Sequence, residues 1–417
     1  MTMVLTASAL LLTASDLEAQ QASRLTIGGY GEAVMTRNFY SNNYKRYTNA
    51  DLYKDDQSHG QFDLPHVVIY LGYDFGHGWT MGTEIEFEHG GPEAAVEIEE
   101  EETGEYETEV ERGGEVALEQ FWIQKSWSST ANLRMGHIIV PIGLTNQHHM
   151  PTEFFTVYRP EGESTILPCT WHQTGVSFWG RSKAWRYEIQ FIAGLEADLF
   201  DAKSWVNGGS ASPYEFDLAN SYATAFRLDN YSIPGLRIGV SGYLGNTAQN
   251  SLKAFKYKDV SGTLAIAALD LDYNAHNWVV RGSIDYGHLG DSEQITKINK
   301  TLGKNSVSPQ TSVASDAICA GIEAGYDLLA QIANQHDKQR QLYIFGRYDY
   351  YDSMFRTEGS VVDNPCWSRQ KFTIGLNYKP MRDIVIKGEY AYRRLDAQFN
   401  DEPSVSVGIA YSGFFKK

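Results

Sequence analysis

The residues best suited to chemistry lie in one segment, which opens with VPIGLTNQHHMP (Val140–Pro151). This stretch contains the neighbouring histidines His148 and His149, and His172 follows further along. A protein zinc site needs three or four converging ligands, and the side chains of adjacent residues usually point apart. The sequence therefore favours polar contacts of these histidines with a wall of the protein, and a metal site at the three histidines remains the alternative.

The same segment, residues 142–172, differs in composition from the other long connections of the chain. It is rich in proline and aromatic residues, whereas most of the others are charged or rich in Gly, Ser and Asn. A loop extended into solvent has no need of several aromatic side chains to pack. We expect residues 142–172 to fold into a larger body and to narrow a passage there, and an outer loop packed on its neighbours or on a partner subunit is the alternative. Its charged residues are Glu153, Arg159, Glu161 and Glu163.

A second unusual segment is the acidic run EAAVEIEEEETGEYETEVER (Glu93–Arg112). It holds ten glutamates and one arginine, a net charge of −9 out of −17 for the whole chain. Such a segment is too charged to bury, which predicts a solvated outer loop. Carboxylates suit Ca²⁺ and Mg²⁺, but this run lacks the Asn, Asp and Gly punctuation of a defined cation site.

Composition restricts the class of protein. The 417 residues include 26 Tyr, 19 Phe, 9 Trp and 38 Gly, a mixture typical of β-structure with many turns. The net charge of −17 argues against a nucleic-acid partner. No G-x-S-x-G, H-E-x-x-H or P-loop motif is present, so we expect neither an enzyme nor a cofactor, although a catalytic triad is defined by geometry. Three cysteines are too few for a disulfide framework, and a pairing of two of them remains open.

Residues 1–19 read as a secretory signal peptide, with a short apolar core and the small residue Ala19 before Gln20. A buried N-terminal helix is the alternative reading. We therefore expect an exported protein whose remaining residues, 20–417, form one domain.

From Arg24 onward the dominant signal is a period-two alternation of apolar and polar residues. In WTMGTEIEFEH, for example, Trp79 and Ile85 share one face and Glu84 lies on the other. Most of these segments have the length of a tilted membrane strand. Sixteen are predicted, at 24–38, 62–75, 79–89, 115–127, 132–141, 173–181, 185–195, 221–229, 236–245, 261–273, 278–289, 316–327, 341–352, 370–379, 384–396 and 404–415.

The connections alternate between short and long, as in bacterial outer-membrane barrels, and 328–340 is the exception, a long connection among the short ones that is read as a helical turn. A sheet in hydrocarbon must close on itself, because an unsatisfied backbone group there costs several kcal/mol. The sequence thus predicts an all-β transmembrane antiparallel barrel of about 16 strands, with residues 142–172, its third loop, folded inward. Such a barrel is expected to hold an aqueous lumen, lined by charged residues that include Glu84, Glu86, Glu88, Arg227, Arg281, Arg347, Lys387 and Arg393.

Two stretches resemble a known family. RMGHIIVPIGL (Arg134–Leu144) and GGYGEA (Gly28–Ala33) are similar to the phosphate-selective porins O and P, in the form widespread in Bacteroidetes. The resemblance implies a sixteen-stranded, usually trimeric channel of the Gram-negative outer membrane, in contact with lipid and lipopolysaccharide and passing small polar solutes or ions. The family lines its pore with Arg and Lys, several of them on the third loop.

This sequence departs from that family pattern, because its third loop has Arg159 as its single basic residue against Glu153, Glu161 and Glu163. Charge at a constriction decides which ions are enriched. We therefore expect a general diffusion pore with weak cation preference. An anion- or phosphate-selective porin, or a barrel that serves as a surface adhesin or scaffold, remains the alternative.

Overall fold

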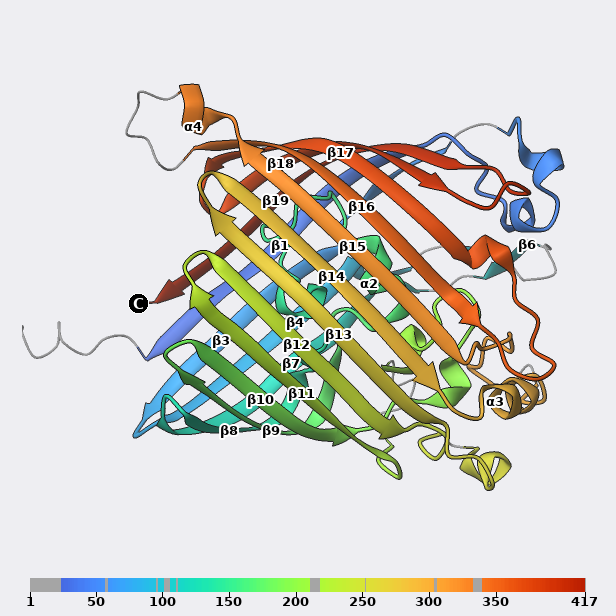
Figure 1. The fold of residues 1–417 in the computed structure, drawn as a ribbon, viewed down its shortest axis with the longest axis horizontal. Helices are drawn as coiled ribbons and strands as arrows, with labels where there is room; N and C mark the ends of the chain where they lie inside the picture. The colour runs from blue at the N-terminus through green and yellow to red at the C-terminus, as the bar shows by residue number, and fades with distance from the viewer. Residues whose placement is uncertain are drawn as a thin grey trace, which may run out of the picture.

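The described chain forms one closed antiparallel barrel (Figure 1), which confirms the predicted fold class. The strands are β1 (Leu25–Asn38), β2 (His59–Asp63), β3 (His66–Gly76), β4 (Trp79–Ala94), β7 (Arg112–Ser128), β8 (Ala131–Ile139), β9 (His172–Ser182), β10 (Trp185–Ala193), β11 (Tyr222–Ile233), β12 (Leu236–Asn246), β13 (Thr263–Ala275), β14 (Trp278–Leu289), β15 (Asp316–Asp327), β16 (Gln341–Arg356), β17 (Ser368–Met381), β18 (Ile384–Arg394) and β19 (Glu402–Lys416). The predicted signal peptide, residues 1–19, lies outside the described residues. The computed structural model describes residues 24–56, 59–94, 97–100, 106–109, 112–210, 218–251, 253–303, 306–332 and 340–416, with side chains except at 91–115 and 415–416.

The first and last strands close the barrel, in a ladder that runs from Thr26 opposite Lys416 to Asn38 opposite Ser404. On its other side β1 pairs with both β2 and β3. Pro65 lies in the gap between these two strands, and proline has no N–H to give to a ladder. The single strand predicted over 62–75 is therefore wrong in detail. Counted together, β2 and β3 occupy one place in the sheet, and the barrel has sixteen strands as predicted.

Side chains alternate between an apolar exterior and a buried interior, as β13 illustrates. Leu269 and Leu271 are exposed on the outside, whereas Leu264, Ile266 and Asp270 are buried on the inside. The exposed apolar side chains recur on strands all around the barrel. A surface of this kind matches hydrocarbon, which explains why the outward face of each strand needs no polar residue.

Short and long connections lie at opposite ends of the barrel, as the sequence predicted. In Figure 1 the short turns and both ends of the described chain are on the left, and the long connections are on the right. The exception, 328–340, begins with the short helix α4 (Leu329–Ile332), which confirms the predicted helical turn. Among the described residues, no helix is both long and apolar enough to cross a membrane. The long connections carry η1 (Tyr44–Tyr47), η2 (Ala50–Tyr53), η4 (Ala197–Leu199), η5 (Asn207–Ser210), η6 (Ala254–Tyr257), α3 (Ser292–Asn299) and η7 (Pro365–Trp367).

The acidic segment 93–112 was expected to be a solvated outer loop. Part of it forms a separate two-stranded antiparallel sheet, β5 (Glu97–Glu100) with β6 (Tyr106–Glu109). Paired strands satisfy each other's backbone groups in this way even where the side chains are mostly charged. The side chains of the segment lie outside the described residues.

Part of the barrel interior near the long connections is an apolar core, so the space left for the expected aqueous lumen is smaller than the barrel wall alone would enclose. Trp171, Phe200 and Trp205 from two different connections are fully buried there, together with wall residues such as Leu264 and Ile266. Sixteen strands do enclose more space than wall side chains can fill. Inward-folded connections occupy much of that space.

Candidate functional site

The third loop was predicted at residues 142–172 and comprises residues 140–171 in the structure. It leaves the wall after β8, crosses the barrel interior and returns to the wall at β9. It contains η3 (Thr145–Gln147) and α2 (Glu161–Ile166). In Figure 1, α2 lies inside the barrel, between the front and rear strands. The loop makes hydrogen bonds with β14, β16, β17 and β18, strands on the far side of the sheet from β8 and β9. The prediction of an inward-folded third loop is confirmed.

Asn146 ties together the two ends of the third loop. Its side-chain N–H groups donate to the carbonyls of Ile142 (3.0 Å) and Pro168 (3.3 Å), and its side-chain oxygen accepts from the Trp171 amide (2.8 Å). All three bonds are buried, where an unsatisfied backbone group would be costly. These bonds hold the two ends of the loop next to each other where it leaves the wall.

Glu163, predicted at the constriction, is instead a buried structural residue. Its carboxylate accepts the backbone N–H groups of Leu144 (3.1 Å) and Thr145 (2.9 Å) and the hydroxyl of Ser283 (3.1 Å). At Gly143 (φ +75°) an added Cβ would lie 2.1 Å from the Glu163 Oε1 atom, so only glycine fits. Burial raises the pKa of Glu163 to about 7. This carboxyl is unavailable to passing ions.

Glu161, also predicted at the constriction, joins α2 to the wall of β16–β18. It accepts hydrogen bonds from Lys371 Nζ and Tyr351 Oη, both at 2.5 Å, and pairs with Arg393 at 2.5 Å. Burial alone would raise the pKa of Glu161, but Arg393 and Lys371 hold it well below its usual range. The carboxylate is ionised and its charge is neutralised by the wall.

The middle of the loop is fixed by aromatic and backbone contacts. The ring of Phe155 stacks on Phe345, with centroids 5.3 Å apart and planes inclined by 12°. Lys387 Nζ donates to the carbonyls of Phe154 (3.0 Å) and Thr156 (2.7 Å). Charged donors form stronger hydrogen bonds than neutral ones. Lys387, predicted to line the lumen, faces inward but is buried beneath the loop.

Arg227, Arg281 and Arg347 also face the interior, yet they are held in ion-pair networks rather than in open water. Arg227 is buried, bonds Asp229 and Asp270, and donates to the Gly143 carbonyl at 2.8 Å. Arg347 and Arg281 share Glu323, at 3.2 and 2.9 Å. A buried charge needs such partners. The alternation in the sequence correctly predicted that these side chains face the barrel interior. It did not show that the third loop covers them.

The adjacent histidines point to different partners. His148 approaches Asp272 (3.5 Å) and Glu153 (4.0 Å), near the turn end of the barrel. His149 Nδ1 lies 3.2 Å from the Asn146 carbonyl. Burial lowers the pKa of both imidazoles, and it raises the pKa of Glu153 to about 7 against the opposing effect of Arg281. His172 lies on β9 beside His137, at 2.5 Å, so the three histidines do not converge.

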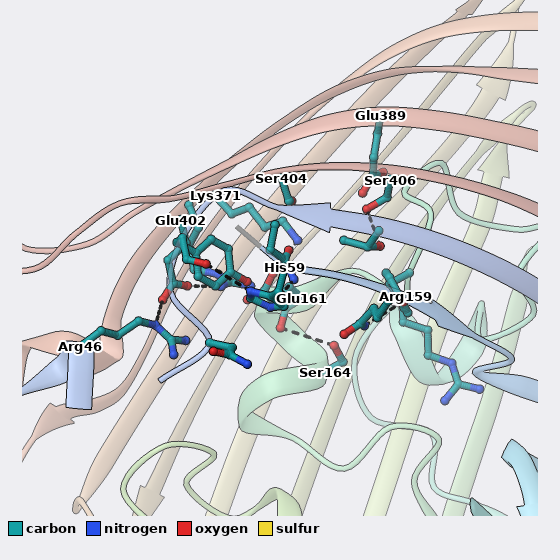
Figure 2. Close-up of a pocket in the computed structure, with 17 residues that line it drawn as sticks. Arg46, His59, Arg159, Glu161, Ser164, Lys371, Glu389, Glu402, Ser404 and Ser406 are labelled. Carbon is teal, nitrogen blue, oxygen red and sulfur yellow. Dashed lines mark hydrogen bonds and ion pairs between the residues drawn. The ribbon is translucent and has the colours of Figure 1, made fainter. Parts of the chain in front are cut away.

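A polar cavity of about 420 Å³ lies between the third loop and the wall of β1 and β17–β19, toward the long connections (Figure 2). Figure 2 shows Glu161, Lys371, Glu402 and Arg46 gathered at one side, while the Arg159 guanidinium points away from them. Arg46 pairs with Glu402 at 3.1 Å, and Arg393 bonds the same carboxylate. The cavity is lined by basic, acidic and neutral side chains. The basic residues are Arg46, Arg159, Lys371 and Arg393, the acidic residues are Glu161, Glu389 and Glu402, and the others include serines, amides, Tyr40 and Tyr158.

The predicted acidic face of β4 also points inward, where Glu84 and Glu86 are buried and Glu88 is half-buried. A fourth carboxylate, Glu119 of β7, joins them and was not singled out from the sequence. Glu119 is the extra residue at a bulge, because Glu84 pairs with Gln120 and Ile85 with Leu118. A bulge changes the direction in which a side chain points, and this one adds Glu119 to the inner face.

A second connection, between β10 and β11, also folds inward over residues 194–210 and was not predicted to do so. Within it Leu195, Phe200, Trp205 and Val206 are fully buried. Its η5 end touches the third loop, where Asn207 donates to the Ser164 carbonyl at 2.7 Å. The signal was present in the sequence, since this connection contains Phe and Trp as the third loop does.

Comparisons with known proteins place the fold. No family model matches the chain. An uncharacterized protein of Aquifex aeolicus (strain VF5) is 26% identical over 377 residues, which cover 88% of this chain and 75% of that protein. One similar solved structure is OmpF of Salmonella typhi in complex with daunomycin, with a TM-score of 0.56 and 11% identity, covering 94% of this chain and 98% of that one. Others are an anion-selective porin from Comamonas acidovorans (0.53, 11%, 94% and 100%) and the outer-membrane channel DcaP of Acinetobacter baumannii (0.51, 10%, 94% and 98%). At these identities the similarity is one of fold.

Proposed function

We propose that this protein is a porin of the Gram-negative outer membrane, through which small hydrophilic solutes and ions diffuse. The observation that carries the proposal is a polar cavity of about 420 Å³ inside a closed barrel whose outer surface is apolar. An apolar exterior favours lipid, and a polar interior wall favours water and polar solutes. The proposal includes export by the signal peptide of residues 1–19, contact with lipopolysaccharide, and assembly as a homotrimer.

The third loop sets the narrowest part of the passage in this proposal. Glu161 and Phe155 connect it to the far wall, and Asn146 closes its base. A loop fixed at both base and tip keeps a constant bore, whereas a loose loop would give fluctuating current. The cavity shown in Figure 2 is the outer chamber of the passage.

The ion selectivity we propose is weak. Two of the carboxylates on which the predicted cation preference rests do not attract passing cations. Glu163 is buried, and Glu161 is paired with Lys371 and Arg393. Glu153 is the remaining loop carboxylate and is half-buried beside Arg281. The preference for cations stays a prediction that now depends on Glu153 and on the acidic face of β4.

An anion-selective channel, as the family resemblance implies, is the second candidate. One observation favours it, namely that the cavity wall carries four basic side chains against three carboxylates. Rings of charge at a narrow point determine which ion enters. Phosphate block of the chloride current would support this candidate.

Planar-bilayer recording of the purified full-length protein tests the proposal. We expect stable unit conductance in KCl, and a reversal potential close to zero across a tenfold KCl gradient. A large reversal potential of the anion-selective sign, or block by sub-millimolar phosphate, would favour the second candidate. Folded barrels that give no conductance would contradict both and leave a surface adhesin or scaffold.

A further inference from the structure

The inner wall formed by β1, β3, β4 and β7 concentrates negative charge. Glu84, Glu86 and Glu119 are all buried there, next to Glu32 of β1. The cation on the loop side is Arg159, whose Nη2 atom is buried without a hydrogen-bond partner among the described residues. Several carboxylates buried together need protons or a cation to balance them.

Three potential ligands converge within this patch. Glu84 of β4, Glu119 of β7 and His149 of the third loop each offer one ligand atom, and these atoms all lie within 4.8 Å of one another. The β-bulge described above brings Glu119 to the level of Glu84. The three residues come from two strands and from a loop that crosses the barrel, so the site exists only in the folded protein.

Each of these side chains is oriented by a neighbour outside the group. The Tyr30 hydroxyl donates to Glu119 at 3.0 Å, and the Gln120 amide donates to Glu84. His149 Nδ1 faces the Asn146 carbonyl at 3.2 Å, which makes Nδ1 the protonated nitrogen and leaves the Nε2 lone pair free. Metal-binding histidines in proteins are usually held in this way, by a carbonyl or carboxylate on the other ring nitrogen.

A separate observation is a buried carboxylate oxygen on β1 that has no hydrogen-bond partner among the described residues. Glu32 on β1 is 5% exposed, and its Oε1 atom has no hydrogen-bond partner among the described residues. The cations that act on Glu32 are Lys387 and Arg159, and the carboxylates Asp63 and Glu86 oppose them. A buried, unpaired carboxylate oxygen is unfavourable in an interior of low dielectric constant. Positive charge bound nearby would reduce this cost.

We propose that Glu84, Glu119 and His149 bind one divalent transition-metal ion, which joins the third loop to β4 and β7. One imidazole with two carboxylates suits Zn²⁺ or Mn²⁺, whereas Ca²⁺ and Mg²⁺ prefer oxygen ligands alone. Of the three histidines that the sequence suggested for a metal, only His149 takes part. The site goes beyond the proposed pore function and does not depend on it.

The test is metal binding to the purified, detergent-solubilised barrel after treatment with a chelator. Isothermal titration with Zn²⁺, Mn²⁺ and Ca²⁺ is expected to show one Zn²⁺ per chain, bound more tightly than Ca²⁺. Glu119→Gln and His149→Ala should each weaken Zn²⁺ binding at least about tenfold. His148→Ala, a change at the adjacent histidine that points elsewhere, is the matched control and should leave binding unchanged.

A second measurement covers variants that fail to fold. Co²⁺ added to the chelator-treated native protein should give visible absorption bands, and X-ray absorption should show mixed nitrogen and oxygen donors. Absence of stoichiometric Zn²⁺ binding by the native protein would overturn the proposal. A proton shared by the buried carboxylates would then be what balances their charge. Binding that is lost in His148→Ala but kept in His149→Ala would overturn it equally.

Discussion

Glu161 Oε2 lies 2.5 Å from Lys371 Nζ, and this ion pair joins the third loop to the wall on the far side of the barrel. The loop leaves the wall at β8 and returns at β9, whereas Lys371 belongs to β17. Arg393 of β18 pairs with the same carboxylate. The loop is therefore fixed at its tip by charge as well as at its base by Asn146.

Removal of that charge should loosen the loop. In Glu161→Gln the amide keeps a hydrogen bond but leaves Lys371 without this counter-ion and Arg393 with Glu402 alone. We therefore expect a loss of about 2 kcal/mol in stability and a larger, noisier unit conductance. Heat-modified electrophoresis and bilayer recording measure these effects. Glu293→Gln on α3 is the control, because its pair with Lys297 is exposed and such pairs contribute little. A unit conductance in Glu161→Gln with the size and noise of the native channel would contradict a role of the Glu161–Lys371 pair in fixing the bore.

The second inward connection makes a tight contact with the wall at Gly287 of β14. A Cβ added at Gly287 would lie 2.1 Å from the Trp205 ring, so Gly287→Ala should force Trp205 to move and lower stability by about 1–3 kcal/mol. Gly346→Ala on β16 is the matched control, because the nearest atom to its added Cβ is 4.0 Å away. Thermal unfolding followed by near-UV circular dichroism compares the two. Equal melting temperatures would show that Trp205 of this connection is not packed against β14.

The pH dependence of selectivity should follow Glu153. Burial raises the pKa of Glu153 to about 7, so this carboxyl is neutral at pH 5.5 and negative at pH 8.5. Cation permeability relative to chloride should therefore rise as pH increases through 7. The charged groups that surround it are Arg281, Asp272, Lys379 and His148, and burial lowers the pKa of His148 so that this imidazole stays neutral over the same range.

Reversal potentials in a KCl gradient, measured at several pH values, check this expectation. Glu153→Gln should remove the change between pH 5.5 and 8.5 while leaving unit conductance within about twofold. A variant that keeps the native pH profile would assign the titration to another group.

Arg46 is expected to bias the outer chamber toward anions. It lies on η1, pairs with Glu402 at 3.1 Å and lines the cavity. Arg46→Gln removes one positive charge there, and Glu402 keeps its partner Arg393. We expect the reversal potential to shift toward cation preference. Lys45→Gln, a change on the same turn outside the cavity lining, should shift it much less, and an equal shift in both variants would indicate general surface charge instead.

The sequence alone was sufficient for the architecture, because the relevant signals are local. Alternation in segments such as 79–89 and 384–396 reports the two faces of a strand, and the sorting of long and short connections reports the two ends of the barrel. The proline and aromatic content of residues 142–172 also predicted a packed loop. Strand boundaries were less well predicted near Pro65, where one residue interrupts a ladder.

The tertiary structure decided what the charged side chains do, because pairing depends on residues far apart in the chain. Alternation placed Arg227 and Lys387 on the inner face, but only the path of the third loop buries them. Glu161 and Glu163 are two residues apart, yet one is paired with Lys371 and the other accepts backbone N–H groups. The convergence of Glu84, Glu119 and His149 depends on a bulge and on a crossing loop, and neither leaves a periodic signal in the sequence.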